Sequence, residues 1–103
     1  VYNSVQEMQS PDLTFQIQTY TVSVVTDLYR CFAASSGLAN DMFLTGFEVI
    51  PGNRNIIHHV LVYADTSNTT LQKDASDPLP GYTNFGGVGS NSAVLIGGWV
   101  PGT

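Results

Sequence analysis

The stretch Asn55-Ile56-Ile57-His58-His59-Val60-Leu61-Val62-Tyr63-Ala64 decides how the rest of the chain is interpreted. Its Ile, Val and Tyr residues favour a strand. Apolar side chains fall on both alternating faces, which is typical of a strand that is buried on both sides. The only two histidines of the chain lie side by side in its middle. Because a buried imidazole without a partner costs about 1–3 kcal/mol of desolvation, the pair needs an explanation.

Two explanations for the histidine pair are open. In the first, each ring donates to a backbone carbonyl or to a water molecule and fills the core. In the second, His58 and His59 bind a metal ion, since neutral imidazole suits zinc, copper, iron and nickel. Adjacent side chains on a regular strand point to opposite faces. The two rings therefore share one ion only if the strand bulges or twists at this point.

The low charge of the chain bounds its fold class and its partners. With 103 residues it is at most one domain, and 11% of its residues are charged, against about 25% in an average globular protein. Ser, Thr, Asn and Gln between apolar residues favour strands and turns. The net charge of −5 argues against nucleic acid and against an anionic membrane surface. No apolar run approaches the ~20 residues of a membrane span.

Alternation of apolar and polar residues predicts further strands around the histidine stretch. They are expected over residues 13–18, 20–24, 27–33, 41–50 and 93–100, after a polar lead-in arm over residues 1–11. Pro51-Gly52-Asn53 is a strong turn signal, and it joins the 41–50 strand to the histidine strand as a hairpin. We therefore predict an all-β fold, an antiparallel β-sandwich of jelly-roll type without a substantial helix.

Residues 65–89 form a long stretch without periodicity. Loops of this length in small domains tend to be functional or oligomer-forming. Within this one, Asn68-Thr69-Thr70 is a glycosylation sequon, which has meaning only in a eukaryotic secretory route. The turn Pro101-Gly102-Thr103 has no element after it, which indicates a truncated domain. We expect strand edges left exposed by the truncation to pair between copies of the chain, as a homo-oligomer.

Other catalytic constellations have weaker support. The residue types of a Ser-His-Asp triad are present, but without a nucleophile elbow or any other fixed spacing. Among the candidate carboxylates for glycoside hydrolysis, Asp74 and Asp77 lie in a loop where turn formation explains an aspartate. The single cysteine, Cys31, excludes an internal disulfide. We interpret it as a buried, inert thiol.

Several ordered landmarks resemble one enzyme family, the copper type II, ascorbate-dependent monooxygenases, of which peptidylglycine hydroxylase and dopamine β-hydroxylase are members. The landmarks are Asp27-Leu28-Tyr29-Arg30-Cys31-Phe32, Gly46-Phe47-Glu48-Val49-Ile50-Pro51-Gly52 and His58-His59-Val60-Leu61-Val62-Tyr63. Two later stretches, Gly81-Tyr82-Thr83-Asn84-Phe85-Gly86-Gly87 and Gly97-Gly98-Trp99-Val100-Pro101-Gly102, are similar to the bacterial branch of that family.

The resemblance implies a fold, a cofactor and a location. The family's core resembles two jelly-roll-like sandwiches, each with one copper, and the N-terminal copper supplies an electron. His58 and His59 correspond to two of its three histidine ligands. The third histidine and the catalytic copper domain, which hydroxylates a C–H bond, would lie beyond this chain. Cys31 has a disulfide partner in the family, expected in bacterial relatives where this chain has Asn84. An extracellular or periplasmic location follows from the same resemblance.

Two functions are therefore expected. The first is the N-terminal, copper-binding, electron-transfer domain of a copper- and ascorbate-dependent monooxygenase, without activity as this piece alone. The missing C-terminal copper domain would be its partner. The alternative is a non-catalytic β-sandwich, a binding or structural module whose histidines fill the core. In that module Tyr82, Phe85 and Trp99 are expected to be exposed aromatics near loops.

Overall fold

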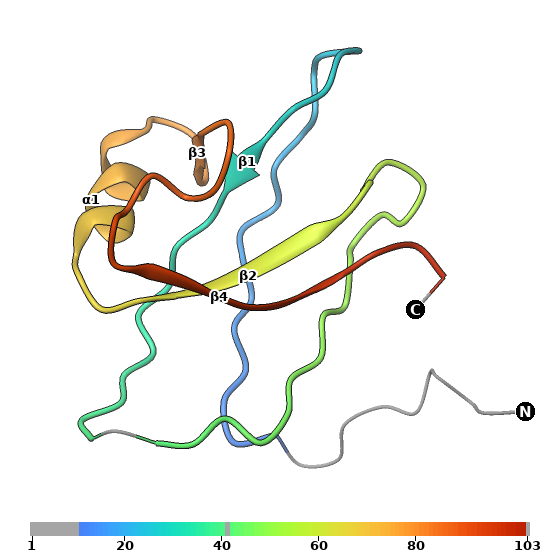
Figure 1. Ribbon diagram of the computed structural model, residues 1–103. Helices are drawn as coiled ribbons and strands as arrows, with labels where there is room; N and C mark the ends of the chain where they lie inside the picture. Colours follow the sequence, from blue (N-terminus) through green and yellow to red (C-terminus); the bar gives the residue numbers. More distant parts are fainter. Residues whose placement is uncertain (1–10, 41, 103) are drawn as a thin grey trace, which may run out of the picture.

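The computed structural model describes residues 11–40 and 42–102, and strand outweighs helix in it. Its elements are β1 (Arg30–Cys31), β2 (Val60–Asp65), α1 (Thr69–Ser76), β3 (Tyr82–Thr83) and β4 (Ala93–Trp99). The strands form two antiparallel two-stranded sheets, β1 with β3 and β2 with β4 (Figure 1). The β-rich character predicted from the sequence is confirmed. The jelly-roll sandwich stays a prediction.

The longer sheet, β2 with β4, is the main ribbon of the molecule. Its register runs from Val60 opposite Trp99 to Asp65 opposite Ala93, with an irregularity between Val62 and Tyr63. The strand predicted over 93–100 is confirmed as β4. The histidine strand is shorter than predicted, because regular pairing begins only at Val60.

The two glycines of β4 permit close packing on the sheet. A methyl group on Gly97 would overlap the ring of Phe47, and one on Gly98 would lie 2.6 Å from the carbonyl oxygen of Val60. The lack of a side chain therefore lets Phe47 contact the β4 backbone. This contact joins the region before β2 to the sheet.

The segment between β2 and β4 contains more structure than the sequence predicted. The expectation of an irregular 65–89 loop is wrong over α1 and β3. The helix begins after Asn68, whose carbonyl accepts from the Gln72 amide at 2.9 Å. It ends before Pro78, which cannot continue a helix with a regular hydrogen bond. The helix is short and has no buried residue, so its sequence lacks the apolar periodicity from which a helix is predicted.

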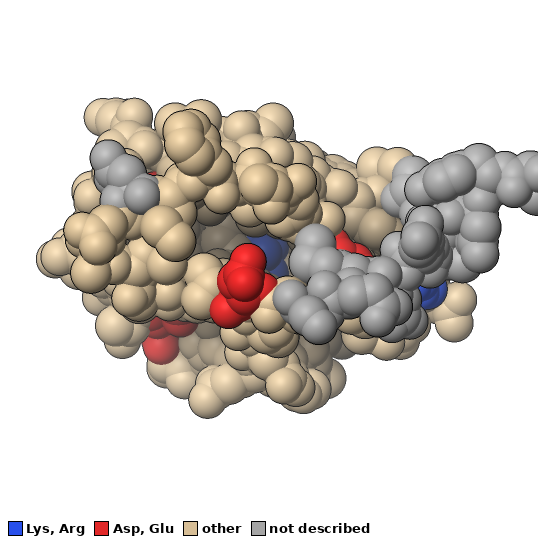
Figure 2. All heavy atoms as spheres, turned by 90° about the horizontal axis from the view of Figure 1, so that it is seen from below, with Lys and Arg blue, Asp and Glu red and all other residues tan. Residues whose placement is uncertain are grey.

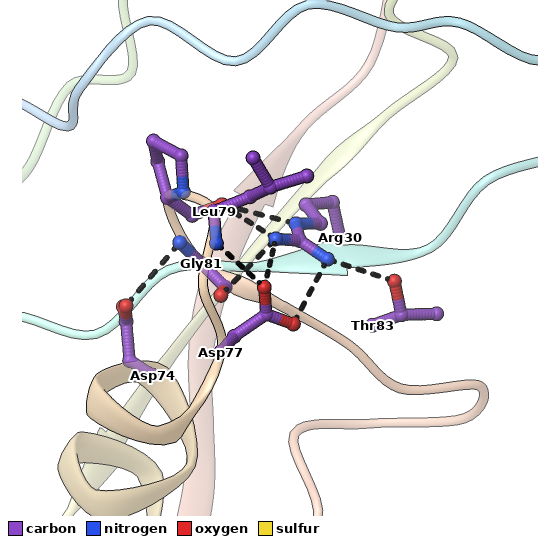
Figure 3. Close-up of polar contacts among 7 residues, drawn as sticks. Arg30, Asp74, Asp77, Leu79, Gly81 and Thr83 are labelled. Carbon is purple, nitrogen blue, oxygen red and sulfur yellow. Dashed lines mark hydrogen bonds and ion pairs between the residues drawn. The ribbon is translucent and has the colours of Figure 1, made fainter.

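The smaller sheet, β1 with β3, is held by Arg30 (Figure 3). The guanidinium donates to Asp77 at 3.0 Å and to the carbonyl oxygens of Pro80 at 2.9 Å and Gly81 at 3.2 Å. It also donates to Thr83 Oγ1 at 3.0 Å. The Arg30 side chain thereby fixes the turn between α1 and β3 to β1, which lies about fifty residues earlier in the sequence.

Most strands predicted in the N-terminal half are absent. The described residues over 13–18, 20–24 and 42–50 have no strand, and the 27–33 strand is reduced to β1. In Figure 1 these segments run as long irregular stretches, for the most part above and below the β2–β4 ribbon. The predicted hairpin between 41–50 and the histidine stretch is wrong, since β2 pairs with β4 instead. The predicted lead-in arm lies almost entirely outside the described residues.

The buried apolar side chains of the described residues are Tyr82, 5% exposed, and Trp99, 7% exposed. Many large apolar side chains are open to solvent instead, with Phe43 98% exposed. Charged residues are sparse on the face shown in Figure 2. The fold is therefore stabilised chiefly by backbone ladders and polar networks around a very small core.

Candidate metal centre

His58 and His59 lie on an irregular, exposed segment directly before β2. The predicted turn upstream is confirmed: the Asn55 amide donates to Asn53 Oδ1 at 3.0 Å, and the Ile56 amide donates to the Asn53 carbonyl at 3.3 Å. The prediction that the two rings are buried within a strand is wrong. No partner strand pairs with this segment among the residues that the structure describes, because the ladder starts at Val60.

The two imidazoles face each other. Their Nδ1 atoms are 3.2 Å apart, and the ring centroids are 5.2 Å apart at an interplanar angle of 65°. Adjacent side chains of a regular strand would diverge, so the irregular backbone meets the condition for both rings to share an ion. The same distance also fits an N–H···N hydrogen bond between one protonated and one bare Nδ1.

The pair fits copper in distance and in donor type. An imidazole nitrogen lies about 2.0–2.1 Å from a bound first-row metal, so two nitrogens on one ion are at most about 4.2 Å apart. The 3.2 Å separation satisfies this limit. Imidazole is a preferred ligand of copper. Within the described part of the chain, no group of three or more His, Cys, Asp or Glu side chains is placed to hold a metal.

Cys31 is half-buried against the β3 side of the small sheet. Burial raises the pKa of its thiol, while a hydrogen bond with Tyr82 and the charge of Arg30 lower that pKa by less. A thiol with a raised pKa is a weak nucleophile near neutral pH. The predicted full burial of Cys31 is wrong, since it is half-buried, and its inert role stays a prediction. The Tyr82 hydroxyl donates to the Val88 carbonyl at 2.6 Å, and burial is the main cause that raises the pKa of Tyr82 to about 12.

Cys31 and Asn84 lie against the same carbonyl oxygen. The thiol is 3.7 Å from the Gly87 oxygen, and Asn84 Nδ2 donates to that oxygen at 3.1 Å. The Asn84 amide also donates to the Tyr29 carbonyl at 3.1 Å, which continues the β1–β3 pairing by one residue. Cys31 and Asn84, the positions at which the resemblance implies a disulfide in bacterial relatives, are therefore neighbours in space.

The prediction of exposed aromatic side chains is wrong for two of the three residues. Tyr82 and Trp99 are the buried apolar residues named above, with the Arg54 guanidinium over the Trp99 ring at 5.7 Å. Phe85 is 81% exposed and packs edge-on against Tyr29 with 4.9 Å between ring centroids. The histidines of the alternative function are exposed and do not fill a core.

A polar network that the sequence did not predict surrounds Asp65. The carboxylate accepts from Ser67 Oγ at 2.9 Å, Ser92 Oγ at 2.8 Å, Ser90 Oγ at 3.1 Å and Thr70 Oγ1 at 3.0 Å. A further bond from the Ser67 amide is the largest cause that holds the pKa of Asp65 well below its usual range. The signal for it is an aspartate at a strand end with a serine two residues later, which is typical of an Asx-turn.

Of the two aspartates predicted to form turns in a loop, Asp77 does so, whereas the prediction is wrong for Asp74, which lies in α1 and accepts from amides outside the helix. Asp74 accepts from the Ala33 amide at 2.8 Å and the Gly81 amide at 3.2 Å. Asp77 accepts from the Leu79 amide at 2.9 Å and pairs with Arg30. Their oxygens are engaged by backbone donors and a guanidinium. They do not form a hydrolytic pair facing a substrate site.

Comparison of the chain with protein-family models, with curated proteins and with solved structures finds no match. No helix among the described residues is long and apolar enough to cross a membrane.

Proposed function

We propose that the chain is the N-terminal copper-binding domain of a copper- and ascorbate-dependent monooxygenase that hydroxylates C–H bonds. In this proposal His58 and His59 bind copper, the complete domain is a jelly-roll β-sandwich, and the protein acts outside the cytoplasm. The observation that carries the proposal is the separation of 3.2 Å between the two exposed Nδ1 atoms. A second observation, the placement of Asn84 beside Cys31, supports the resemblance on which the wider function rests.

The copper ion, when bound, supplies one electron at a time through its two oxidation states. The protein's part is to present two neutral imidazoles in one place. Ligation through Nδ1 leaves the ring proton on Nε2, which is then the donor toward water or a partner. Because a protonated ring cannot ligate, copper affinity decreases in acid. Exposure of both rings allows a second protein surface to reach the site for electron transfer.

Copper titration followed by electron paramagnetic resonance tests the proposal. We expect the wild type to bind copper through nitrogen ligands. His58→Ala and His59→Ala should each lose most of the affinity, and the double variant little more, because the two rings act as a unit. Asn55→Ala is the matched control, since it changes the same exposed segment and keeps the backbone amide of the turn. Unchanged uptake by the double variant would rule out the assigned ligands.

A second candidate function is a non-catalytic binding module of the same β-rich fold. It is favoured by the surface pair of Tyr29 and Phe85, whose rings pack edge-on with Phe85 81% exposed. Such a pair suits stacking against the apolar face of a sugar. A glycan screen should then show saturable binding that is lost in Phe85→Ala and is unaffected by a chelator. Glycan binding that is lost in the presence of a chelator would instead assign the binding to a metal ion at the histidine pair.

A further inference from the structure

The network around Asp65 brings its oxygen atoms into more contacts than it has protons to share. Asp65 Oδ1 lies 2.9 Å from Ser67 Oγ, 3.1 Å from Ser90 Oγ and 2.8 Å from Ser92 Oγ. Ser90 Oγ also lies 3.3 Å from Ser67 Oγ and 3.2 Å from Ser92 Oγ. Each of the three hydroxyls supplies one proton. The carboxylate supplies none near neutral pH, because the bond from the Ser67 amide holds its pKa well below the usual range.

The contacts of Ser90 with the other two serines are the ones left without a proton. When all three hydroxyls donate to Asp65, lone pairs face each other across both of these contacts. A positive ion among the oxygens relieves that repulsion. Asp65 Oδ2 is engaged separately, since it accepts from the hydroxyl of Thr70 at 3.0 Å and from its amide at 3.4 Å, at the start of α1. Oδ1 and the three serines are therefore the part of the network that suits a cation.

An open hollow of about 380 Å³ lies beside these oxygens. Its lining residues carry no charge, and they are Ser67, Thr69, Gly89, Ser90, Asn91 and Ser92. All three serines of the cluster belong to this lining, so an ion from solvent reaches them and water has room to complete its shell. No Lys or Arg forms an ion pair with Asp65 among the residues that the structure describes. The negative charge of the carboxylate is therefore available to an ion.

We propose that Asp65 Oδ1 and the hydroxyl oxygens of Ser67, Ser90 and Ser92 form a calcium site. Oxygens bound at about 2.3–2.6 Å in the flexible shell of Ca²⁺ are about 2.7–3.7 Å from their neighbours, whereas those in the octahedral shell of Mg²⁺ are about 2.8–3.0 Å apart. The contacts of 3.2 and 3.3 Å between the serines fit the larger ion.

The calcium site is separate from the proposed copper site. Asp65 is the last residue of β2, whereas the histidines lie before its first residue. Ser90 and Ser92 directly precede β4, and Asp65 pairs with Ala93 across the sheet. A bound ion therefore ties the end of β2 to the start of β4. It stabilises the folded chain to the extent that it binds the folded state alone.

Calorimetric titration of the chelator-treated chain with calcium chloride tests the inference. We expect one ion per chain with a Kd of about 10⁻⁴–10⁻³ M, the weak range of calcium sites, because the site has a single carboxylate. The melting temperature should rise with calcium concentration. Asp65→Asn should abolish binding, and Ser90→Ala should lower the affinity about tenfold, since the shell loses a ligand. Asp12→Asn and Ser35→Ala are the matched controls, because both change exposed residues outside the cluster.

Several outcomes would overturn the calcium site. A wild type that shows neither binding heat nor a change in melting temperature has no such site. Undiminished binding in Ser90→Ala places the ion elsewhere, and this variant stays informative if Asp65→Asn does not fold. An equal response to magnesium chloride excludes selection of the larger ion. The double variant His58→Ala/His59→Ala should bind calcium as the wild type does, and loss of calcium binding in it would contradict the assignment to the serines.

Discussion

The two halves of the molecule, residues 11–58 and residues 60–99, both contain many apolar residues but differ in regular structure. The second half contains β2, α1, β3 and β4 and both buried apolar side chains, Tyr82 and Trp99. In the first, the described residues contain β1 as their one strand, and side chains such as Phe43 are exposed. The difference shows that an alternating apolar pattern yields a strand only where a partner supplies the ladder hydrogen bonds.

The halves are joined at a few identifiable contacts. Arg30 holds the turn after α1, and the carbonyl of Cys31 lies so close to Gly81 that a methyl group there would overlap it. Phe47 lies over Gly97 of β4. Variants at these contacts show how far the first half depends on the second.

The largest expected effect is a gain in the free energy of unfolding from a disulfide that joins the two halves. Asn84→Cys places a second thiol beside Cys31, where both positions contact the Gly87 carbonyl. Under mild oxidation a disulfide should form and raise the free energy of unfolding by about 2–4 kcal/mol, measured by urea denaturation with and without reductant. Thr83→Cys is the control, because Thr83 turns toward Arg30. Two titratable thiols in oxidised Asn84→Cys would contradict the neighbouring placement.

Removal of the Arg30 guanidinium should be the next largest effect. Arg30→Met leaves Asp77 and the carbonyls of Pro80 and Gly81 without their shared donor. We expect a loss of about 2–3 kcal/mol in the free energy of unfolding, since hydrogen bonds to charged groups are the stronger ones. Arg30→Lys keeps the charge without the planar fork and should recover only part of the loss. Equal stability of Arg30→Met and wild type would show that the junction is not fixed by this side chain.

The contact between Phe47 and β4 is tested by adding and removing volume. Gly97→Ala should destabilise by about 1–3 kcal/mol through overlap with the Phe47 ring. The double variant Gly97→Ala/Phe47→Ala should recover much of that loss in the same denaturation experiment. Gly52→Ala, which has open space around the added methyl group, should be close to neutral. Additive losses in the double variant would place Phe47 away from β4.

The smallest expected effect is an acid sensitivity that belongs to the second half. The folded-state pKa of Asp65 is held low by the Ser67 amide and the surrounding hydroxyls. Its stabilisation is therefore complete above the ordinary aspartate pKa of about 3.9 and is lost as the pH falls toward the folded-state value. In the wild type, the urea midpoint of unfolding should decrease from neutral to acidic pH. This decrease should be smaller in Asp65→Asn. Asp12→Asn, an exposed change with the same charge effect, is the control.

Sequence patterns were most informative where local chemistry suffices. The Ala93–Trp99 strand was predicted almost to the residue, because an apolar run bounded by turn residues needs only one partner strand. The turn at Asn53 followed from its side chain, which accepts from the Asn55 amide. The predicted strands at 13–18, 20–24 and 42–50 were wrong for lack of partners, and the short helix α1 was missed because its start is organised by Asp65.

The candidate site divides in the same way. The sequence identified His58 and His59 as the candidate ligand pair, because they are the two imidazoles of the chain. It placed them in a buried strand, where they would point apart. Their exposure and their 3.2 Å approach follow from the backbone being irregular until Val60.

The sequence by itself determined the β-rich composition, the turns, the last strand and the identity of the metal-ligand candidates. These depend on residue type and on interactions between near neighbours. Only the tertiary structure decided that β2 pairs with β4, that Arg30 fixes the loop after α1, and that Cys31 lies beside Asn84. Those contacts join residues distant in sequence. Their formation depends on which long loops close and which backbone groups find partners, and a local pattern does not contain that information.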